Sequence, residues 1–156
     1  MTLIERLQAL TGPDREVDLI IYLNRWPESE IASITKYRRG LDSADGYSWD
    51  ILHGAVIFQK MQDGRCPHNG GYPLPAFTGS IDAAMTLVPE WASIELTISA
   101  ARDVNDRAFT RCRLWDWRRS PVGFDAGNEW LSEGRRLVEL NVCIAATKAR
   151  EAQHEQ

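Results

Sequence analysis

The stretch PAFTGSIDAAMTLVP, residues 75–89, carries the clearest helix start and stop signals of this sequence. Pro75 keeps the chain extended, and Ser80 is a good N-cap for a short helix that Pro89 ends. Asp82 complements the positive end of the helix dipole. The buried face of this helix is predicted to carry Ile81, Ala84, Met85 and Val88. The segment has no nucleophile beside a base, so we expect it to serve as framework that pins a helix to a sheet.

The segment that follows alternates in the way that strands alternate. Residues 92–99 and 108–117 each place apolar side chains on one face and polar or mixed side chains on the other. The polar turn between them predicts an antiparallel hairpin. The core face is expected to carry Ile94, Leu96 and Ile98 from the first strand and Cys112 and Leu114 from the second. The opposite face of the second strand, here called the Arg–Trp face, carries Phe109, Arg111, Arg113, Trp115 and Trp117.

Helical periodicity marks three further segments. Residues 3–10 have one apolar face, a second apolar helix runs to about Asn24 before Pro27, and a third helix is predicted from about Ser132 to Ala149. Residues 32–42 and 48–60 are compatible with strands, and residues 62–75 are rich in Gly and Pro and predict a loop. We therefore predict an α+β fold: a small antiparallel sheet layered with helices, α–β–α sandwich-like, with a loop-rich insertion at about 28–74 and a frayed tail from about residue 150.

Length and composition predict a single domain over residues 1–156. The net charge of −4 gives no overall attraction to nucleic acid or to an anionic membrane, so an anion site needs a local concentration of Arg. Three widely spaced cysteines argue against a disulfide framework, and the N-terminus is no signal peptide. No apolar run approaches membrane-spanning length. These features predict a cytoplasmic protein.

The Arg–Trp face is the strongest candidate site. Aromatic rings can stack on a nucleobase, and guanidinium groups can pair with phosphate. The adjoining Arg118 and Arg119 extend its positive charge. The competing interpretation is that the Trp rings pack under another layer or a subunit while the Arg side chains reach water. Both interpretations stay open at this point.

Other kinds of site have weaker support. Cys66 and His68, with His53 nearby in sequence, lack the paired spacing of a zinc site, so we expect no metal and no cofactor. No G-x-S-x-G motif is present, and no carboxylate pair is singled out. An enzyme is therefore the less favoured class.

Three segments carry a family resemblance: LIERLQALTGPDREVDLIIYL (3–23), LPAFTGSIDAAMTLVP (74–89) and LVELNVCIAATKARE (137–151). They resemble small phage and prophage proteins with the phage ABA-sandwich domain, whose pattern is roughly "GPDRELD", "PxYTxSLDAALxLVP" and "CxAALKAR". Phe77 stands where Tyr is usual and Ile81 where Leu is usual, and residues 28–70 fall outside the resemblance. The resemblance implies an α–β–α layered fold and a phage accessory role in the cytoplasm of an infected bacterial host, without a settled activity.

These observations lead to three functional hypotheses. The first is a non-catalytic phage accessory protein that binds and sequesters a small anionic, nucleotide-type ligand, such as a host immune signal. The second is a protein- or nucleic-acid-binding module, although nucleic acid fits the overall charge poorly, and the third is a small nucleotide hydrolase. The ligand-binding hypothesis names Arg111, Arg113, Trp115, Trp117, Arg118 and Arg119, with Phe77, Thr78 and Ser80 at the helix start. The six tryptophans also predict a homo-oligomer, most simply a two-fold dimer.

Overall fold

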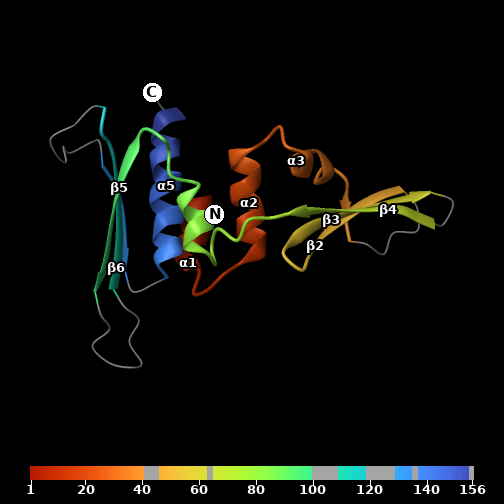
Figure 1. Cartoon of the computed structure of the whole chain (residues 1–156), viewed down its shortest axis with the longest axis horizontal. Coiled ribbons are helices and arrows are strands. Elements are labelled where there is room, and N and C mark those ends of the chain that lie inside the picture. Colours follow the sequence, from red (N-terminus) through yellow and green to blue (C-terminus); the bar gives the residue numbers. More distant parts are fainter. Residues whose placement is uncertain (41–45, 63–64, 100–108, 119–128, 135–136, 155–156) are drawn as a thin grey trace. The chain divides into compact units, whose positions relative to one another are not determined.

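A computed structural model describes residues 1–40, 46–62, 65–99, 109–118, 129–134 and 137–154 (Figure 1). These residues form five helices and two mostly antiparallel sheets, which confirms the predicted α+β class. The chain divides into two compact units, one made of Met1–Asp14 with Phe77–Gln156 and the other of Arg15–Ala76. Within the described part of the chain, no helix is both long enough and apolar enough to cross a membrane.

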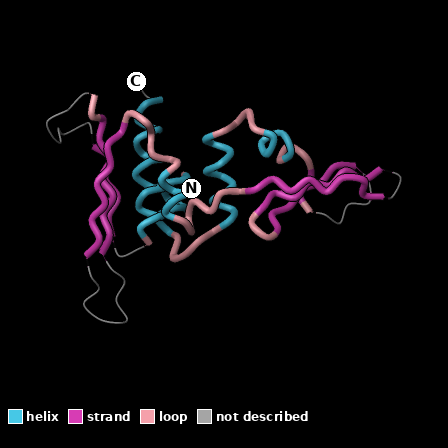
Figure 2. The backbone as a smooth tube through the Cα atoms, in the orientation of Figure 1, coloured by secondary structure: helices cyan, strands magenta, loops and turns pink. Residues whose placement is uncertain are grey.

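The first unit combines a three-stranded sheet with three helices (Figure 2). Its elements are α1 (Leu3–Ala9), α4 (Ile81–Met85), β5 (Ala92–Ser99), β6 (Phe109–Asp116), β7 (Glu129–Gly134) and α5 (Val138–His154). The sheet order is β5–β6–β7, and both pairings are antiparallel. The predicted hairpin is thus confirmed as β5 and β6. The third strand was not predicted, because Ser132 was assigned to the helix that in fact begins at Val138.

Helix α5 is the centre of this unit. It packs on β6 and β7 on one side and on α1 and α4 on the other. All residues from Leu140 to Ala146 are buried, as expected for a helix that is covered on both sides. The described part of α5 continues to His154, past residue 150, where a frayed tail was expected.

Helix α4 begins where the sequence predicts. The Ser80 side chain accepts a hydrogen bond from the Ala83 N–H, as an N-cap does. The predicted buried face needs correction: Ala84 and Leu87 are buried, whereas Ile81 is 39% exposed. The helix is only five residues long, and the turn that follows it places Leu87 in the core.

The second unit contains most of the region that was expected to be loop-rich. Its elements are α2 (Arg15–Arg25), α3 (Glu30–Ile34), β1 (Arg38–Arg39), β2 (Gly46–Leu52), β3 (Ala55–Gln62) and β4 (Arg65–Pro73). The sheet order is β1–β2–β3–β4. Its core is a cluster of buried apolar side chains from helices and strands: Leu19, Ile31, Ile34, Trp49, Val56 and Leu74.

Two predictions in this unit need correction. Of the strand expected at 32–42, the structure describes only Arg38–Arg39 as a strand, β1. The start of that range, up to Ile34, belongs to α3, because Ser29 caps this helix by accepting a hydrogen bond from the Ala32 N–H. The loop expected at 62–75 contains β4, which pairs with β3 along its length. An edge strand tolerates the Gly and Pro residues that suggested a loop.

A tight turn sets the register between β2 and β3. Leu52 lies opposite Ala55, so the loop has two residues, His53 and Gly54, both with positive φ angles of 49° and 80°. This is the conformation of a type I′ turn, whose twist matches the twist of an antiparallel hairpin. The turn thereby aligns the apolar residues of both strands on the face that forms the core.

Candidate functional site

The Arg–Trp face is built by the pairing of three strands. Arg113 lies opposite Glu95 of β5 and Leu131 of β7, and Arg111 lies opposite Thr97 and Glu133. Residues directly opposite one another in antiparallel strands point to the same side of the sheet. The predicted alternation of β6 is confirmed, because Thr110, Cys112, Leu114 and Asp116 are buried while Phe109, Arg111, Arg113 and Trp115 are half-buried.

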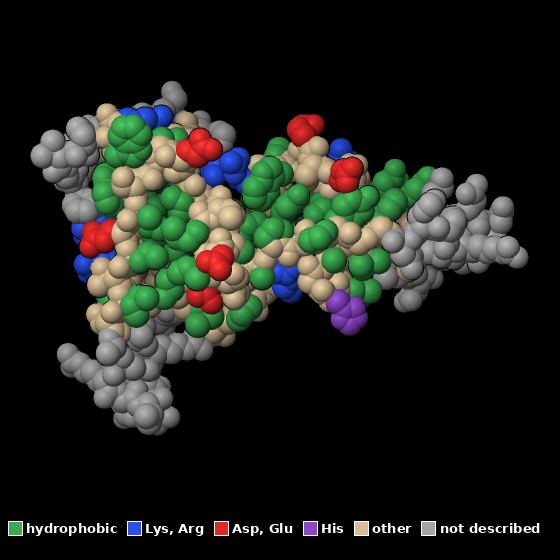
Figure 3. Space-filling view, in the orientation of Figure 1, with side chains coloured by type: hydrophobic (Ala, Val, Ile, Leu, Met, Phe, Trp, Pro, Cys, Tyr) green, Lys and Arg blue, Asp and Glu red, His purple; other side chains and the backbone are tan. Residues whose placement is uncertain are grey.

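Carboxylates lie beside both arginines of the strand. Arg111 Nε lies 2.8 Å from a Glu133 carboxylate oxygen, and these side chains are 39% and 42% exposed. Arg113 Nη1 lies 3.6 Å from Glu95. In Figure 3, basic and acidic side chains lie next to one another at the left edge of the surface. The local concentration of positive charge expected from the sequence of β6 is therefore offset by its neighbouring strands.

Two further candidates, Trp117 and Arg118, lie beyond the end of β6 and outside the alternation of the strand. The strand ends at Asp116, so Trp117 lies beyond it and is 49% exposed. Arg118 donates from Nε and Nη2 to the buried Asp116 carboxylate at 2.9 and 2.8 Å, and its guanidinium lies 5.2 Å from the centre of the Trp91 ring. The hydrogen bonds to Asp116 raise the pKa of Arg118. Arg119 lies outside the described residues.

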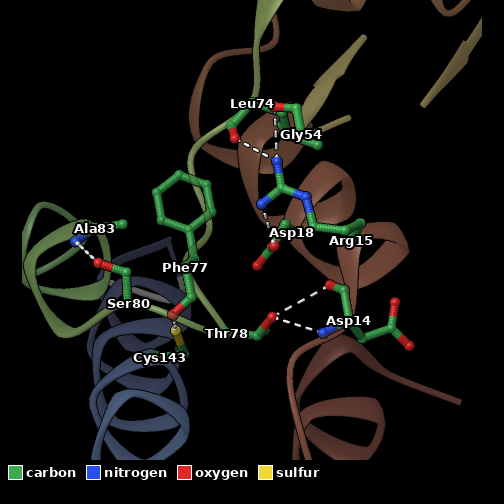
Figure 4. Close-up of polar contacts among 10 residues, drawn as sticks. All are labelled: Asp14, Arg15, Asp18, Gly54, Leu74, Phe77, Thr78, Ser80, Ala83 and Cys143. Atoms are coloured by element: carbon green, nitrogen blue, oxygen red, sulfur yellow. Dashed lines mark hydrogen bonds and ion pairs between the residues drawn. The ribbon is translucent and has the colours of Figure 1, made fainter. Parts of the chain in front are cut away.

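Phe77, Thr78 and Ser80 belong to a different part of the first unit (Figure 4). Phe77 and Thr78 are fully buried, so neither offers surface to a ligand. Thr78 Oγ1 accepts a hydrogen bond from the Asp14 N–H at 2.9 Å and donates to the Asp14 carbonyl at 3.2 Å. The Phe77 carbonyl accepts a hydrogen bond from the Cys143 thiol at 3.3 Å. These contacts join the start of the chain, the 75–89 segment and α5, as expected for framework.

Close packing at Gly79 completes this junction. A Cβ atom added at Gly79 would lie 3.1 Å from Pro13 Cβ and 3.2 Å from Pro13 Cγ, closer than side chains normally approach. At the other end of the segment, Arg150 of α5 donates from Nε and Nη2 to the Leu87 carbonyl. The 75–89 segment is thus fixed at both ends by polar or close contacts.

A buried polar network ties α5 to the sheet. The Asn141 amide donates to the carbonyl and the hydroxyl of Thr110, and its amide oxygen accepts a hydrogen bond from Ser132 at 2.8 Å. All three residues are buried. The helical periodicity of the sequence gave no signal for this network, because its partners come from two strands that the pattern alone cannot align.

Arg15 makes a second structural cluster, in the second unit. Its guanidinium donates to the fully buried Asp18 carboxylate at 2.7 Å and to the carbonyls of Gly54 and Leu74 (Figure 4). The bonds tie α2 to the β2–β3 turn and to the residue after β4. This cluster is structural, since the charge of Asp18 is paired with Arg15 and the other groups to which Arg15 donates here are backbone carbonyls.

Aromatic side chains form a further exposed group in this unit. The rings of Tyr37 and Tyr47 are 5.0 Å apart, and those of Tyr47 and Phe58 are 5.4 Å apart. Tyr37 and Tyr47 are 48% and 38% exposed. Sequence patterns carried no signal for this group, since the register of β2 and β3 brings its rings together.

No metal centre emerges from the described residues. His53 is exposed in the β2–β3 turn, and Cys66 and His68 belong to β4. The part of the chain that the structure describes holds no group of three His, Cys, Asp or Glu side chains that could bind a metal ion.

Comparison of the chain with protein-family models, with curated proteins and with solved structures gives no match. The residues of the Arg–Trp face, together with their pairing, therefore carry the functional argument.

Proposed function

We propose that this protein is a non-catalytic binding module that docks a partner protein on the Arg–Trp face. The observation that carries the proposal is the pairing of charge on that face: Arg111 with Glu133, and Arg113 with Glu95. Aromatic rings and Arg are enriched at protein interfaces, and the mixed charges of this face suit a partner that also carries both signs of charge.

A small polyanionic ligand is less well supported by this arrangement. Phosphate oxygens would have to share the guanidinium groups of Arg111, Arg113 and Arg118 with the carboxylates of Glu133, Glu95 and Asp116. Each of these carboxylates repels the incoming negative charge. The pairing thus favours the second of the three functional hypotheses over the first.

The resemblance of residues 3–23, 74–89 and 137–151 to small phage proteins suggests where to look for the partner. It makes a bacterial host protein the first class to examine. The phage origin itself is part of the proposal, and the binding experiment below does not depend on it.

The experiment exchanges the two members of the more exposed ion pair. Arg111→Glu combined with Glu133→Arg keeps an ion pair with reversed direction, so stability should stay within about 0.5 kcal/mol of the wild type. Wild-type protein immobilised on a support should capture a bacterial protein that mass spectrometry identifies. The purified partner should then bind the exchanged variant about tenfold more weakly or worse, because the complementary charges now repel.

Two outcomes would contradict the proposal. One is that the exchanged variant binds the purified partner as tightly as the wild type. The other is that cyclic dinucleotides or ADP-ribose derivatives raise the melting temperature of the wild type and not of the exchanged variant. That result would support nucleotide sequestration instead. Trp115→Ala, with chemical denaturation measured in parallel, separates loss of binding from loss of fold.

A further inference from the structure

Among the described residues, the sheet edge formed by β5 lacks the short length, the prolines and the multiple charges found at the other sheet edges. Strand β1 has two residues, both Arg; β4 contains two prolines; and β7 contains two glutamates. Short length, Pro and charge are the devices that keep a sheet edge from pairing with another chain. Strand β5, with the sequence ASIELTIS, has eight residues, no Pro and a single charge.

The same strand exposes apolar side chains. Leu96 is 37% exposed and Ile98 is 61% exposed, although both lie on the side of the sheet that carries the buried Cys112 and Leu114. Leu96 and Ile98 were expected in the core. That expectation was wrong because α5 packs on β6 and β7, while β5 lies at the edge of the sheet.

We propose that β5 is the interface of a two-fold homodimer, in which the β5 strands of two copies pair antiparallel and join their sheets. This inference gives the expected oligomer a specific interface. It does not depend on the proposed function, because Leu96 and Ile98 lie on the face opposite to Arg111 and Trp115.

The register of the two β5 strands follows from pairing apolar residues on the same face of the joined sheet and from keeping like charges apart. With Leu96 on the two-fold axis, Leu96 lies opposite Leu96 of the second copy, and Ile94 lies opposite Ile98 of the second copy. All three apolar residues of the core face are then paired. Glu95 lies opposite Thr97 of the second copy and keeps its ion pair with Arg113.

The alternative symmetric registers are poorer. With Glu95 on the axis, two carboxylates lie directly opposite one another, which is destabilising. With Thr97 on the axis, Ile94 lies opposite a position beyond the end of β5 at Ser99. The sequence of β5 is therefore most nearly self-complementary around Leu96, which favours a second copy of this chain over an unrelated peptide.

The test measures the mass of the full chain by light scattering across micromolar concentrations. Wild type should give twice the chain mass of 17.7 kDa. The double variant Leu96→Lys with Ile98→Lys places like charges across the interface and should raise the dissociation constant about tenfold or more. Ile81→Lys, at an apolar position that is 39% exposed on α4, is the matched control and should remain dimeric.

A cross-linking experiment tests the register. In a background with Cys66→Ser and Cys112→Ala, which removes the thiol directly opposite Leu96 on β6, Leu96→Cys should form an intermolecular disulfide under mild oxidation, whereas Thr97→Cys should not. If the double lysine variant unfolds by circular dichroism, Ile98→Lys alone replaces it at the more exposed site. A wild-type mass of 17.7 kDa, a lysine variant that dimerises like the wild type, or cross-linking at Thr97 in place of Leu96 would overturn the proposal.

Discussion

Replacing Thr78 by Val tests whether the 75–89 segment is framework. Valine has nearly the shape of threonine but lacks the hydroxyl that bonds both the N–H and the carbonyl of Asp14. A buried backbone group that loses its partner costs about 1–3 kcal/mol. Because Thr78 is fully buried whereas Asp14 is half-buried, we take the lower end for each of the two groups and expect a loss of about 2 kcal/mol.

Urea denaturation followed by circular dichroism measures the loss. Thr86→Val is the matched control: its hydroxyl donates to the Ala83 carbonyl at 2.7 Å, but this threonine is exposed, so the change should cost less than about 0.5 kcal/mol. The dependence of the unfolding free energy on urea should be the same in both variants, which shows that they unfold in the same manner. Equal stabilities of the two variants would refute the framework argument, since the buried and exposed hydroxyls would then be equivalent.

Further predictions concern packing and thiol chemistry. Gly79→Ala should cost about 1 kcal/mol or more because the new Cβ presses on the rigid Pro13 ring, whereas Gly12→Ala, with no atom within 4 Å of its Cβ, should be neutral; thermal unfolding of both variants checks this. Burial raises the pKa of the Cys112 thiol to about 12, so it stays protonated at pH 8, and mass mapping after alkylation should find it unmodified until the protein unfolds. Rapid alkylation of Cys112 in the native protein would contradict its burial.

Local patterns in the sequence were sufficient to predict the helices and strands that have a strong apolar periodicity or a clear N-cap. The apolar stripes predicted α1, α2 and most of α5, and strict alternation predicted β5 and β6. Ser80 predicted the start of α4, because an N-cap side chain bonds to a backbone N–H only three residues further along the chain. Where local signals conflict with pairing, as in the Gly- and Pro-rich β4, the sequence pointed to a loop, because the hydrogen bonds that make it a strand come from β3.

The sequence by itself determined the α+β class, the helix start at Ser80 and the alternation that sets Arg111 and Trp115 apart from Cys112. Tertiary structure decided the rest, since each remaining feature depends on residues distant in sequence. Thr78 finds its partner 64 positions away at Asp14, and the arginines of β6 find carboxylates on both neighbouring strands. Periodicity assigns a side chain to a face, but only the pairing of strands determines which charge lies beside it and whether a helix covers it.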